Sequence, residues 1–490
     1  MSTQPQEKAQ GDRFRELLAR KEGRVHFVGI GGVGMAGLAR HLAHRGFTVS
    51  GSDAVPSRIT EWLKQHGIPV AHGHSADQIP QELLCVIRTP AVPDDNPEIR
   101  AAYARCVPVI PRGAALPGLL EATRSIAVAG THGKTTTAAM IAQVLHSAGK
   151  DPSYCVGGEI DALDGVAGVG KGGLMVVEAD ESDGTLRLYA PDIGVITNIE
   201  FDHMEHFASE TEFFACFESY ISNVRGTAIY CGDDDAARRV SSSVGGALAY
   251  GFRDGSDVQG RIKKQDESGT SFTFRFGLGP WEPAHLPVPG VHNVRNALGA
   301  IAAARVLGIE TEAIAAGLAA FRPVRRRFEE VGGTGNVRVI TDYAHHPTEI
   351  AAVIETARIL GPRRLVAIYQ PHRYTRTLAL RDTFPPAFEG VDELVLVPVY
   401  AASESPVPGG TSEDLYAAFA GREKPSVQNA PSLEAAWEWI RAMLEPGDLF
   451  LILGAGDVDK VASWAAEGLS LAPAGSRAAR RLDRSIEMSQ

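Results

Sequence analysis

The chain has 490 residues, which is too long for a single hydrophobic core and predicts about three domains. Its 48 lysine and arginine residues and 59 aspartate and glutamate residues give a formal net charge of −11, which disfavours a general nucleic-acid or membrane-surface binder. The five cysteines are scattered without a C-x-x-C pair, so neither a disulfide framework nor a zinc site is indicated, and a reducing compartment is expected.

The N-terminal stretch Met1–Gly23 is polar and lacks the apolar core of a signal peptide. No segment approaches the roughly 18 consecutive apolar residues of a membrane span. We therefore expect a cytoplasmic protein, a monomer or homodimer, with neither a nucleic acid nor a membrane as partner.

Strand and helix patterns alternate in the first part of the chain. A strand at Val25–Ile30, a glycine turn at Gly31–Gly37, a helix at Leu38–Arg45 and a strand at Thr48–Ser52 form a βαβ unit. Further strands are predicted at Cys85–Thr89 and Val107–Ile110. This domain is predicted to span residues 1–121, since proline and glycine punctuate the segment before residue 121.

The glycine cluster of this first domain contains G-x-G-x-x-G after a strand, and Asp53 ends the next strand. This pattern is typical of a dinucleotide-binding turn. Glycines that serve only close packing are an open alternative, whereas a second nucleotide loop further on disfavours a nicotinamide dehydrogenase. Another diphosphate, such as that of a nucleotide sugar, is the favoured ligand. The candidate substrate-binding residues are Gly31, Gly32, Val33, Gly34, Met35 and Asp53.

The stretch Gly130–Thr137, G-T-H-G-K-T-T-T, directly follows the apolar segment Ser125–Ala129. A glycine-rich turn between a strand and a helix aims backbone N–H groups and a helix dipole at one point, which suits a phosphate. Lys134 can reach the outer phosphates, and the Thr135 hydroxyl can hold Mg²⁺. The usual P-loop would have glycine in place of Val128, so this is a shorter variant, and a plain strand-to-helix turn is the alternative. The candidate ATP-binding residues here are Gly130, Thr131, His132, Gly133, Lys134, Thr135 and Thr136.

The central part continues with a helix at Ala138–Ala148 and buried-type strands at Leu174–Glu178 and Ile193–Asn198. Strands alternating with helices predict a mostly parallel sheet covered on both faces. Period-two alternation over Val258–Leu278 indicates an antiparallel ribbon, and the helix Val291–Leu307 closes the domain. This central domain is predicted to span residues 122–322.

Two acidic motifs end strands of the central domain, E-A-D-E-S-D at Glu178–Asp183 and T-N-I-E-F-D-H at Thr197–His203. In a parallel sheet both motifs open onto the crevice of the phosphate loop, so their carboxylates can bind metal beside a triphosphate. Phosphoryl transfer needs such cations to neutralise charge on the transferred group. A solvated acidic turn is the alternative, which the pairing with Lys134 and His203 disfavours.

On the predicted helix that closes this domain, His292 and Asn296 share a face. Buried polar side chains on an alanine-rich helix need partners, so recognition of a base is a reasonable role. Helix capping is the alternative for Asn293.

The basic stretch Arg322–Arg327 marks the second boundary, and a third α/β domain is predicted over residues 323–490. Its helix is expected at Pro347–Leu360, and its tail Pro473–Gln490 is expected to be loosely held. Its strands are expected at Val337–Thr341, Arg364–Tyr369, Glu393–Pro398 and Leu449–Leu453.

Two motifs follow strands of this third domain, D-Y-A-H-H-P-T-E at Asp342–Glu349 and Q-P-H-R-Y-T-R-T at Gln370–Thr377. Clustered histidine and arginine at strand ends can grip a carboxylate or a phosphate, arginine in a bidentate manner. Salt bridging between domains is the alternative for either cluster.

These segments, in this order, resemble the Mur ligase family over nearly the whole chain. G-I-G-G-V-G-M, P-G-V-H-N-V-R-N-A and R-R-F at Arg326–Phe328 join the motifs above in carrying the resemblance. The resemblance implies an α/β protein with a Rossmann-like N-terminal domain for a UDP-sugar, a central P-loop ATPase with a mostly parallel sheet, and a Rossmann-like C-terminal domain for an amino acid.

The resemblance also implies an activity, in the branch of the family that adds L-alanine. ATP would phosphorylate the lactyl carboxylate of UDP-N-acetylmuramate, and L-alanine would attack the acyl phosphate, in the synthesis of peptidoglycan precursors. Carried over by motif, Lys134 would stabilise the transferred phosphoryl group, Thr135 and Glu178 would hold Mg²⁺, and His203 would help to hold a second metal ion. The ATP contacts would be His292, Asn293, Asn296, Arg327 and Asp342, and the amino-acid and acyl-phosphate side Tyr343, His345, Arg373 and Arg376.

One departure from sister ligases bears on the metal site. Those enzymes place a carbamylated lysine about fourteen residues beyond the histidine that matches His203, whereas Met204–Val224 contains no lysine and has Cys216 in the candidate stretch. Ala344 also replaces a common glycine, which should only tighten the backbone. A ligase that recycles a preformed tripeptide, and an inactive nucleotide-binding scaffold, are the competing interpretations. Selectivity for L-alanine over glycine or L-serine cannot be predicted from the sequence.

Overall fold

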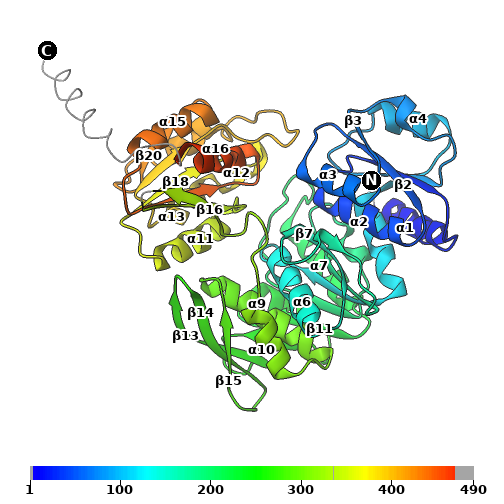
Figure 1. Cartoon of the computed structure of the whole chain (residues 1–490), viewed down its shortest axis with the longest axis horizontal. Helices are drawn as coiled ribbons and strands as arrows, with labels where there is room; N and C mark the ends of the chain where they lie inside the picture. The colour runs from blue at the N-terminus through cyan, green and yellow to red at the C-terminus, as the bar shows by residue number, and fades with distance from the viewer. Residues whose placement is uncertain (1–3, 335, 470–490) are drawn as a thin grey trace, which may run out of the picture. The chain divides into compact units, whose positions relative to one another are not determined.

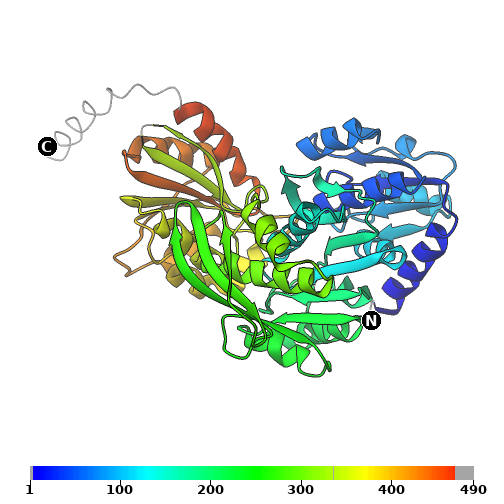
Figure 2. The ribbon, with the colours of Figure 1, turned by 60° about the horizontal axis from the view of Figure 1, so that its bottom comes forward.

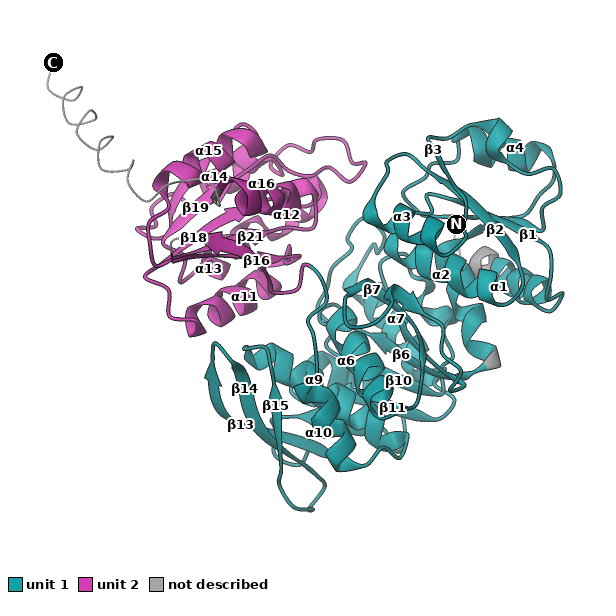
Figure 3. Ribbon diagram, viewed as in Figure 1, with its two compact units in different colours: residues 1–325 teal, residues 326–490 magenta. Residues whose placement is uncertain are grey.

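The computed structural model describes residues 4–334 and 336–469 (Figure 1). The chain divides into two compact units, residues 1–325 and residues 326–490 (Figure 3). The structure contains three sheets, two in the first unit and one in the second. No helix in the described ranges combines the length and the apolar character that a membrane crossing requires.

The first sheet has five parallel strands in the order β3-β2-β1-β4-β5. Because the order reverses between β1 and β4, the carboxyl end of β1 lies at the point where such sheets bind ligands. Helix α2 begins there, after a glycine turn. The elements are β1 (Arg24–Val28), α2 (Val33–His44), β2 (Thr48–Asp53), α3 (Arg58–Gln65), β3 (Val70–His72), β4 (Cys85–Arg88), α4 (Pro97–Ala104), β5 (Val109–Pro111) and α5 (Arg112–Ala115).

The second sheet has ten strands in the order β15-β14-β13-β12-β11-β10-β6-β9-β7-β8. Strand β6 lies between β10 and β9, and all three run parallel, so the segments that follow them meet at one edge. The helices and strands from β6 to β12 are β6 (Arg124–Ala129), α6 (Lys134–Ser147), β7 (Ser153–Ile160), β8 (Gly165–Gly168), β9 (Leu174–Glu178), β10 (Ile193–Ile196), α7 (Glu210–Ser222), β11 (Thr227–Cys231), α8 (Asp235–Ser241) and β12 (Leu248–Gly251).

An antiparallel ribbon extends the second sheet, as the period-two pattern predicted. It consists of β13 (Val258–Asp266), β14 (Gly269–Phe276) and β15 (Glu282–Leu286), and it precedes α9 (Val291–Val306) and α10 (Thr311–Ala319). Helices α6, α9 and α10 pack together on one face of the central strands, and α7 packs on the other (Figures 1 and 2). The many alanines of α6 and α9 bring the helix axes close together.

Helix α6 begins earlier than the sequence predicted, and the N-terminal helix α1 is one of those for which no range was predicted from the sequence. Helix α6 begins at Lys134 rather than Ala138, because Gly133 takes the left-handed conformation that ends the loop. Helix α1 (Gln4–Leu18) lies in the polar N-terminal stretch and buries Phe14 and Leu17 against the first unit. Only these two of its large apolar side chains are buried so deeply. Because the helix is otherwise polar, the sequence pattern did not indicate it.

The third sheet forms the second unit, in the order β16-β17-β21-β18-β19-β20, parallel except for β16. Every residue of β21 is buried, as expected of a strand covered on both faces. The elements are β16 (Glu329–Thr334), β17 (Val337–Asp342), α11 (Pro347–Ile359), β18 (Arg364–Tyr369), α12 (Tyr374–Leu380), α13 (Phe384–Ala387), β19 (Glu393–Leu396), α14 (Ser412–Ala418), β20 (Ser426–Asn429), α15 (Leu433–Met443), β21 (Asp448–Leu453) and α16 (Lys460–Leu469).

The predicted α/β class with three sheets is thus confirmed. The domain limits at residues 121 and 322 stay predictions. The tail that the sequence suggested is loosely held, Pro473–Gln490, lies outside the described residues.

Candidate functional site

The phosphate loop connects β6 to α6 through two glycines with positive φ, Gly130 at 134° and Gly133 at 78°. A Cβ on Gly130 would lie 2.0 Å from the Thr197 hydroxyl oxygen, so this position has no room for any larger residue. Gly133 caps α6 without a side chain, which leaves the amides of the first turn directed at the loop. Backbone amides and the positive end of α6 therefore converge where the sequence predicted a phosphate.

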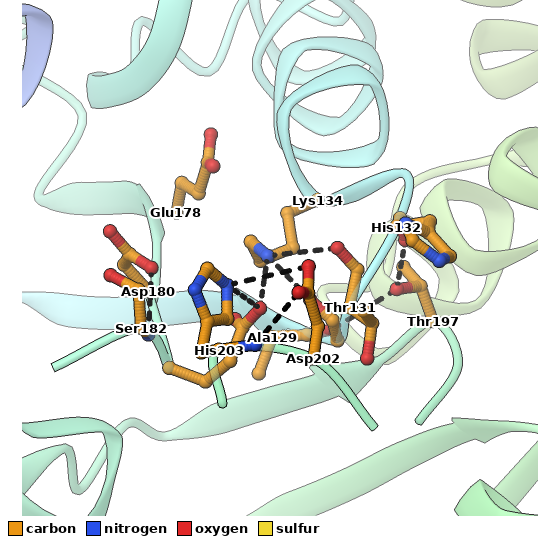
Figure 4. A network of polar contacts seen from close by, with 12 residues as sticks. Ala129, Thr131, His132, Lys134, Glu178, Asp180, Ser182, Thr197, Asp202 and His203 are labelled. Atoms are coloured by element: carbon orange, nitrogen blue, oxygen red, sulfur yellow. Dashed lines mark hydrogen bonds and ion pairs between the residues drawn. The ribbon is translucent and has the colours of Figure 1, made fainter. Parts of the chain in front are cut away.

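The loop is fastened to the end of the neighbouring strand β10. The Thr131 amide donates to the Asn198 carbonyl over 3.0 Å, and the Asn198 side chain both accepts from the His132 amide and donates to its carbonyl, each over 2.8 Å. The Thr197 hydroxyl donates to the same carbonyl over 2.6 Å (Figure 4). These bonds fix the loop's shape before any ligand binds.

The Lys134 side chain lies over the phosphate loop that precedes it. Its ammonium donates to the carbonyls of Gly130 and Thr131 over 2.6 and 3.1 Å and to Glu181 Oε1 over 2.8 Å (Figure 4). Burial alone would lower the pKa of Lys134, but the charges of Glu181 and Asp180 outweigh it and raise the pKa. The lysine is therefore held as a cation at the mouth of the loop.

Thr135 and Glu178 come together as the sequence predicted. The Thr135 hydroxyl donates to Glu178 Oε2 over 2.7 Å, and the Gly157 amide donates to the same oxygen over 2.7 Å. A Cβ on Gly157 would lie 2.3 Å from that oxygen, so only glycine allows this approach. A hydroxyl and a carboxylate so placed are oxygen ligands of the kind that Mg²⁺ prefers.

His203 shares the Glu181 carboxylate with Lys134, and its backbone has a φ of 58°. Its Nε2 is 3.6 Å from Glu181 Oε1, and its Nδ1 is 3.4 Å from Glu205 Oε1. Burial by itself lowers the pKa of His203, but the hydrogen bonds to Glu181 and Glu205 raise it to about 10. The two carboxylates therefore favour the protonated form of the imidazole.

Glu181 is the site residue that the sequence did not single out. Its side chain is fully buried between Lys134 and His203, and its Oε2 has no hydrogen-bond partner among the described residues. An unpaired buried carboxylate oxygen is costly, and a bound cation would relieve that cost. The sequence offered one signal, because Glu181 belongs to the acidic motif after β9, but not which of its carboxylates points inward.

The α9 residues reach the same loop. Asn293 and Asn296 are both buried at 7% exposure, and a Cβ on Gly133 would lie 2.6 Å from Asn296 Oδ1. The Asn293 side chain donates to the Pro289 carbonyl over 2.8 Å, which gives it a part in the helix start. His292 is half-buried in the first turn of the same helix. The structure thus places Asn296 beside the phosphate loop.

The glycine turn of the first sheet is shorter than the predicted Gly31–Gly37, because helix α2 begins at Val33 rather than at Leu38. The Gly31 amide donates to Asp53 Oδ2 over 2.8 Å, so Asp53 holds the turn onto β2. Gly32 caps α2 without a side chain, Val33 begins the helix, and Met35 is buried at 1% exposure and packs in the core. Open amides at the start of α2 suit a diphosphate.

The predicted residues of the second unit surround the ends of β17 and β18. Asp342 accepts backbone hydrogen bonds from Phe328 and Ala344, each over 2.7 Å, and burial raises its pKa to about 6 even though Arg327 lowers it. The Arg327 guanidinium lies 5.1 Å from the centre of the Tyr343 ring. Asp342 therefore links the R-R-F turn to the motif that follows β17.

The histidine and arginine residues of this unit lie close to one another. The rings of Tyr343 and His345 are 5.6 Å apart, as are those of His345 and His372. Arg376 is buried at 3% exposure, with Nη1 3.1 Å from His372 Nδ1, and Arg373 precedes α12 as its N-cap residue at a φ of 70°. The two motifs of the second unit thus form one cluster.

The sequence of the chain matches three protein-family models. Residues 24–124 match the model of the Mur ligase family, catalytic domain, residues 128–304 match the Mur ligase middle domain, and residues 326–456 match the Mur ligase, glutamate ligase domain. The three matches follow the three sheets in order.

Individual relatives cover most of the chain. The UDP-N-acetylmuramate--L-alanine ligase of Syntrophotalea carbinolica is 40% identical over 448 residues, 91% of this chain and 98% of the relative. That of Thermosynechococcus vestitus is 42% identical over 461 residues, 91% of this chain and 95% of the relative.

Solved structures of two ligases also match most of this chain. The UDP-N-acetylmuramate-alanine ligase of Thermotoga maritima matches at a TM-score of 0.80 with 31% identity, over 91% of this chain and 99% of that one. A murein peptide ligase of Psychrobacter arcticus matches at a TM-score of 0.69 with 26% identity, over 92% and 100%. With relatives this similar over nearly their whole length, the chain belongs to the Mur ligase family.

Proposed function

We propose that this protein is an ATP-dependent ligase that joins L-alanine to the lactyl carboxylate of UDP-N-acetylmuramate, in the synthesis of peptidoglycan precursors. The observation that carries the proposal is the convergence of the phosphate loop, Glu178 and His203 at one edge of the central sheet (Figure 4). A phosphate loop beside metal-type ligands suits phosphoryl transfer, and the relatives that cover 91% of the chain supply the substrates.

Mg²⁺ is the metal that fits this edge of the sheet. Thr135 and Glu178 would hold it, and His203 would help to hold a second metal ion. The buried Glu181 Oε2, which has no hydrogen-bond partner among the described residues, supports a cation here. When bound, the metal would neutralise charge on the phosphates of ATP. Binding through His203 would require the imidazole to lose a proton, since a ring nitrogen binds a metal through its lone pair.

Residues of the chain itself would stabilise the charge of the transferred phosphoryl group. Lys134 would turn from the loop carbonyls to the transferred phosphoryl group, where its positive charge stabilises the transition state. Phosphorylation makes the lactyl carboxylate reactive, since phosphate is a better leaving group than oxide. The amine of L-alanine then attacks the acyl carbon, and phosphate leaves.

The remaining site residues would bind the nucleoside of ATP, the UDP-sugar or the amino acid. Asn293, Asn296, His292, Arg327 and Asp342 would contact the nucleoside of ATP, and the glycine turn with Asp53 would hold the UDP-sugar. Tyr343, His345, Arg373 and Arg376 would receive L-alanine and the acyl phosphate. The cluster of rings and guanidinium groups at the ends of β17 and β18 supports this side of the proposal.

Helix α7 bears on the metal site of this branch. It contains no lysine, and the Cys216 thiol is buried at 4% exposure with Sγ 3.6 Å from the Gly184 carbonyl oxygen. An apolar, filled position supports a site without the carbamylated lysine of sister ligases. The recycling of a preformed tripeptide is disfavoured, because the murein peptide ligase matches at a lower TM-score than the alanine ligase.

A product assay tests the proposal. The protein is incubated with ATP, Mg²⁺ and UDP-N-acetylmuramate, and L-alanine, glycine, L-serine or the tripeptide is offered separately. We expect phosphate release that needs the UDP-sugar and a product heavier by one alanyl residue. Phosphate release without regard to the UDP-sugar, or a product formed only with the tripeptide, would overturn the proposal.

A further inference from the structure

The segment between β19 and α14, residues 397–411, lies against the histidine and arginine cluster of the second unit. The Tyr400 amide donates to the Pro371 carbonyl over 2.8 Å, and the Arg373 amide donates to the Tyr400 carbonyl over 2.9 Å. The Tyr400 ring stacks on His372, with ring centres 5.7 Å apart and planes 13° from parallel. This segment therefore forms one wall of the cluster, although no motif in it had been singled out.

Glu404 is the residue of this segment that contacts both Thr375 and Arg373. Its Oε2 accepts from the Thr375 amide over 3.1 Å, and its Oε1 accepts from the Thr375 hydroxyl over 2.7 Å. The Arg373 guanidinium lies 3.5 Å from the same Oε1. With its side chain only 15% exposed, Glu404 is held by Thr375 at both oxygens and presents its charge to Arg373.

Residues on both sides of this contact have backbone conformations that residues other than glycine rarely adopt. Arg373 has a φ of 70°, and Ala402 and Ser403, which lead directly to Glu404, have φ values of 46° and 73°. Such conformations are unfavourable for any residue that has a Cβ. The surrounding hydrogen bonds must hold these three residues in place, so the positions of Arg373 and Glu404 are specified closely.

We propose that Glu404 is a positioning residue that directs the Arg373 guanidinium toward the carboxylate of the incoming amino acid. This inference rests on the proposed function, in which Arg373 receives L-alanine. A guanidinium is planar, so a carboxylate fixed at one edge determines where the remaining N–H groups point. Because Thr375 holds Glu404, a second carboxylate can approach Arg373 without displacing the first.

Glu404→Gln tests this role directly. Glutamine keeps the shape and can still accept a hydrogen bond from Thr375, but it loses the charge that orients Arg373. We expect the KM for L-alanine to rise about tenfold or more, since misplacement by about 1 Å can cost on the order of 100-fold. The KM for ATP and the melting temperature should stay close to those of the wild type.

Two further variants separate positioning from a purely structural role. Thr375→Val removes one of the two bonds that hold Glu404 and should raise the KM for L-alanine by a smaller factor. Glu423→Ala changes an exposed glutamate of the same unit and should alter neither KM.

The outcomes distinguish this inference from the proposed function. A wild-type protein that forms alanyl product while Glu404→Gln retains the wild-type KM for L-alanine would overturn the positioning role alone. A variant that merely loses thermal stability would do the same. Wild-type protein that forms no alanyl product would overturn the proposed function and this inference with it.

Discussion

Arg112 Nη2 donates a hydrogen bond to Asp180 Oδ2 over 2.9 Å and so joins the first sheet's last helix to the acidic motif after β9. The Arg112 side chain is 17% exposed, and a Cβ on Gly34 would lie 2.7 Å from its Nη1. Burial alone would raise the pKa of Asp180, but Arg112 and Lys134 hold it well below its usual range. One arginine thus touches both the start of α2 and the edge that carries Glu178 and Glu181.

Replacing Arg112 by methionine should lower the free energy of unfolding by about 2 kcal/mol, because a partly buried carboxylate loses its charged partner. Urea unfolding followed by circular dichroism measures the loss. Arg238→Met is the matched control, since its pair with Asp235 is exposed on both sides and should be worth less than about 0.5 kcal/mol. Equal losses in the two variants would contradict the structural role of Arg112.

Lys134→Ala should reduce ATP-dependent product formation by about 1000-fold, since the ammonium acts on charge that develops in the transition state. The fold should survive, because the loop is also held by Asn198 and Thr197. Steady-state rates and a circular dichroism spectrum check both parts. Lys150→Ala, an exposed lysine of the same unit, is the control. A rate near that of the wild type would refute the role of Lys134.

The sequence predicted the phosphate loop and its metal-type ligands because each lies at the end of a strand in a parallel sheet. Thr135 and Glu178 are 43 residues apart in the chain, yet they meet through a 2.7 Å hydrogen bond. The order of strands in such a sheet puts the ends of β6 and β9 side by side. Topology was sufficient to place the acidic motif beside the loop, whereas the choice of Glu178 within that motif came from the family resemblance.

The same reasoning could not find contacts made by side chains across elements. Arg112 lies 68 residues from Asp180 in a segment interpreted only as a domain boundary, and Glu404 lies 29 residues from Thr375 in a loop without a motif. Which carboxylate of an acidic run turns inward also depends on packing, so Glu181 went unnoticed. Such contacts follow from side-chain directions that no periodicity encodes.

Gly133→Ala should impair ATP use beyond its effect on stability. At a φ of 78° any Cβ is strained by about 1 kcal/mol, and here it would also lie 2.6 Å from Asn296 Oδ1. Gly149→Ala is a matched control, because Gly149 has a φ of 70° with nothing within 4 Å of the added Cβ. Both variants should lose about 1 kcal/mol through backbone strain, and Gly133→Ala should lose more because its Cβ must displace Asn296. Only Gly133→Ala should lose turnover, by about 100-fold. Similar turnover in both would contradict the placement of Asn296 at the loop.

Asp342 should make the stability of the second unit depend on pH. Burial raises its folded pKa to about 6 from 3.8, so the folded state binds the proton more tightly than the unfolded state. The stability from this group is therefore fully present below the unfolded pKa and is lost as pH rises through about 6, up to about 3 kcal/mol in all. An asparagine side chain cannot titrate, so in Asp342→Asn this part of the fall should vanish.

Urea unfolding between about pH 4.5 and pH 7 measures the effect as a difference between wild type and variant. The wild type should lose more stability than Asp342→Asn over this range, since only its buried carboxyl must ionise. Asp382→Asn removes a carboxylate that is 85% exposed and should leave the wild-type slope unchanged. Parallel curves for wild type and Asp342→Asn would mean that Asp342 is already ionised at the acid end of the range, and its burial would then not govern its titration.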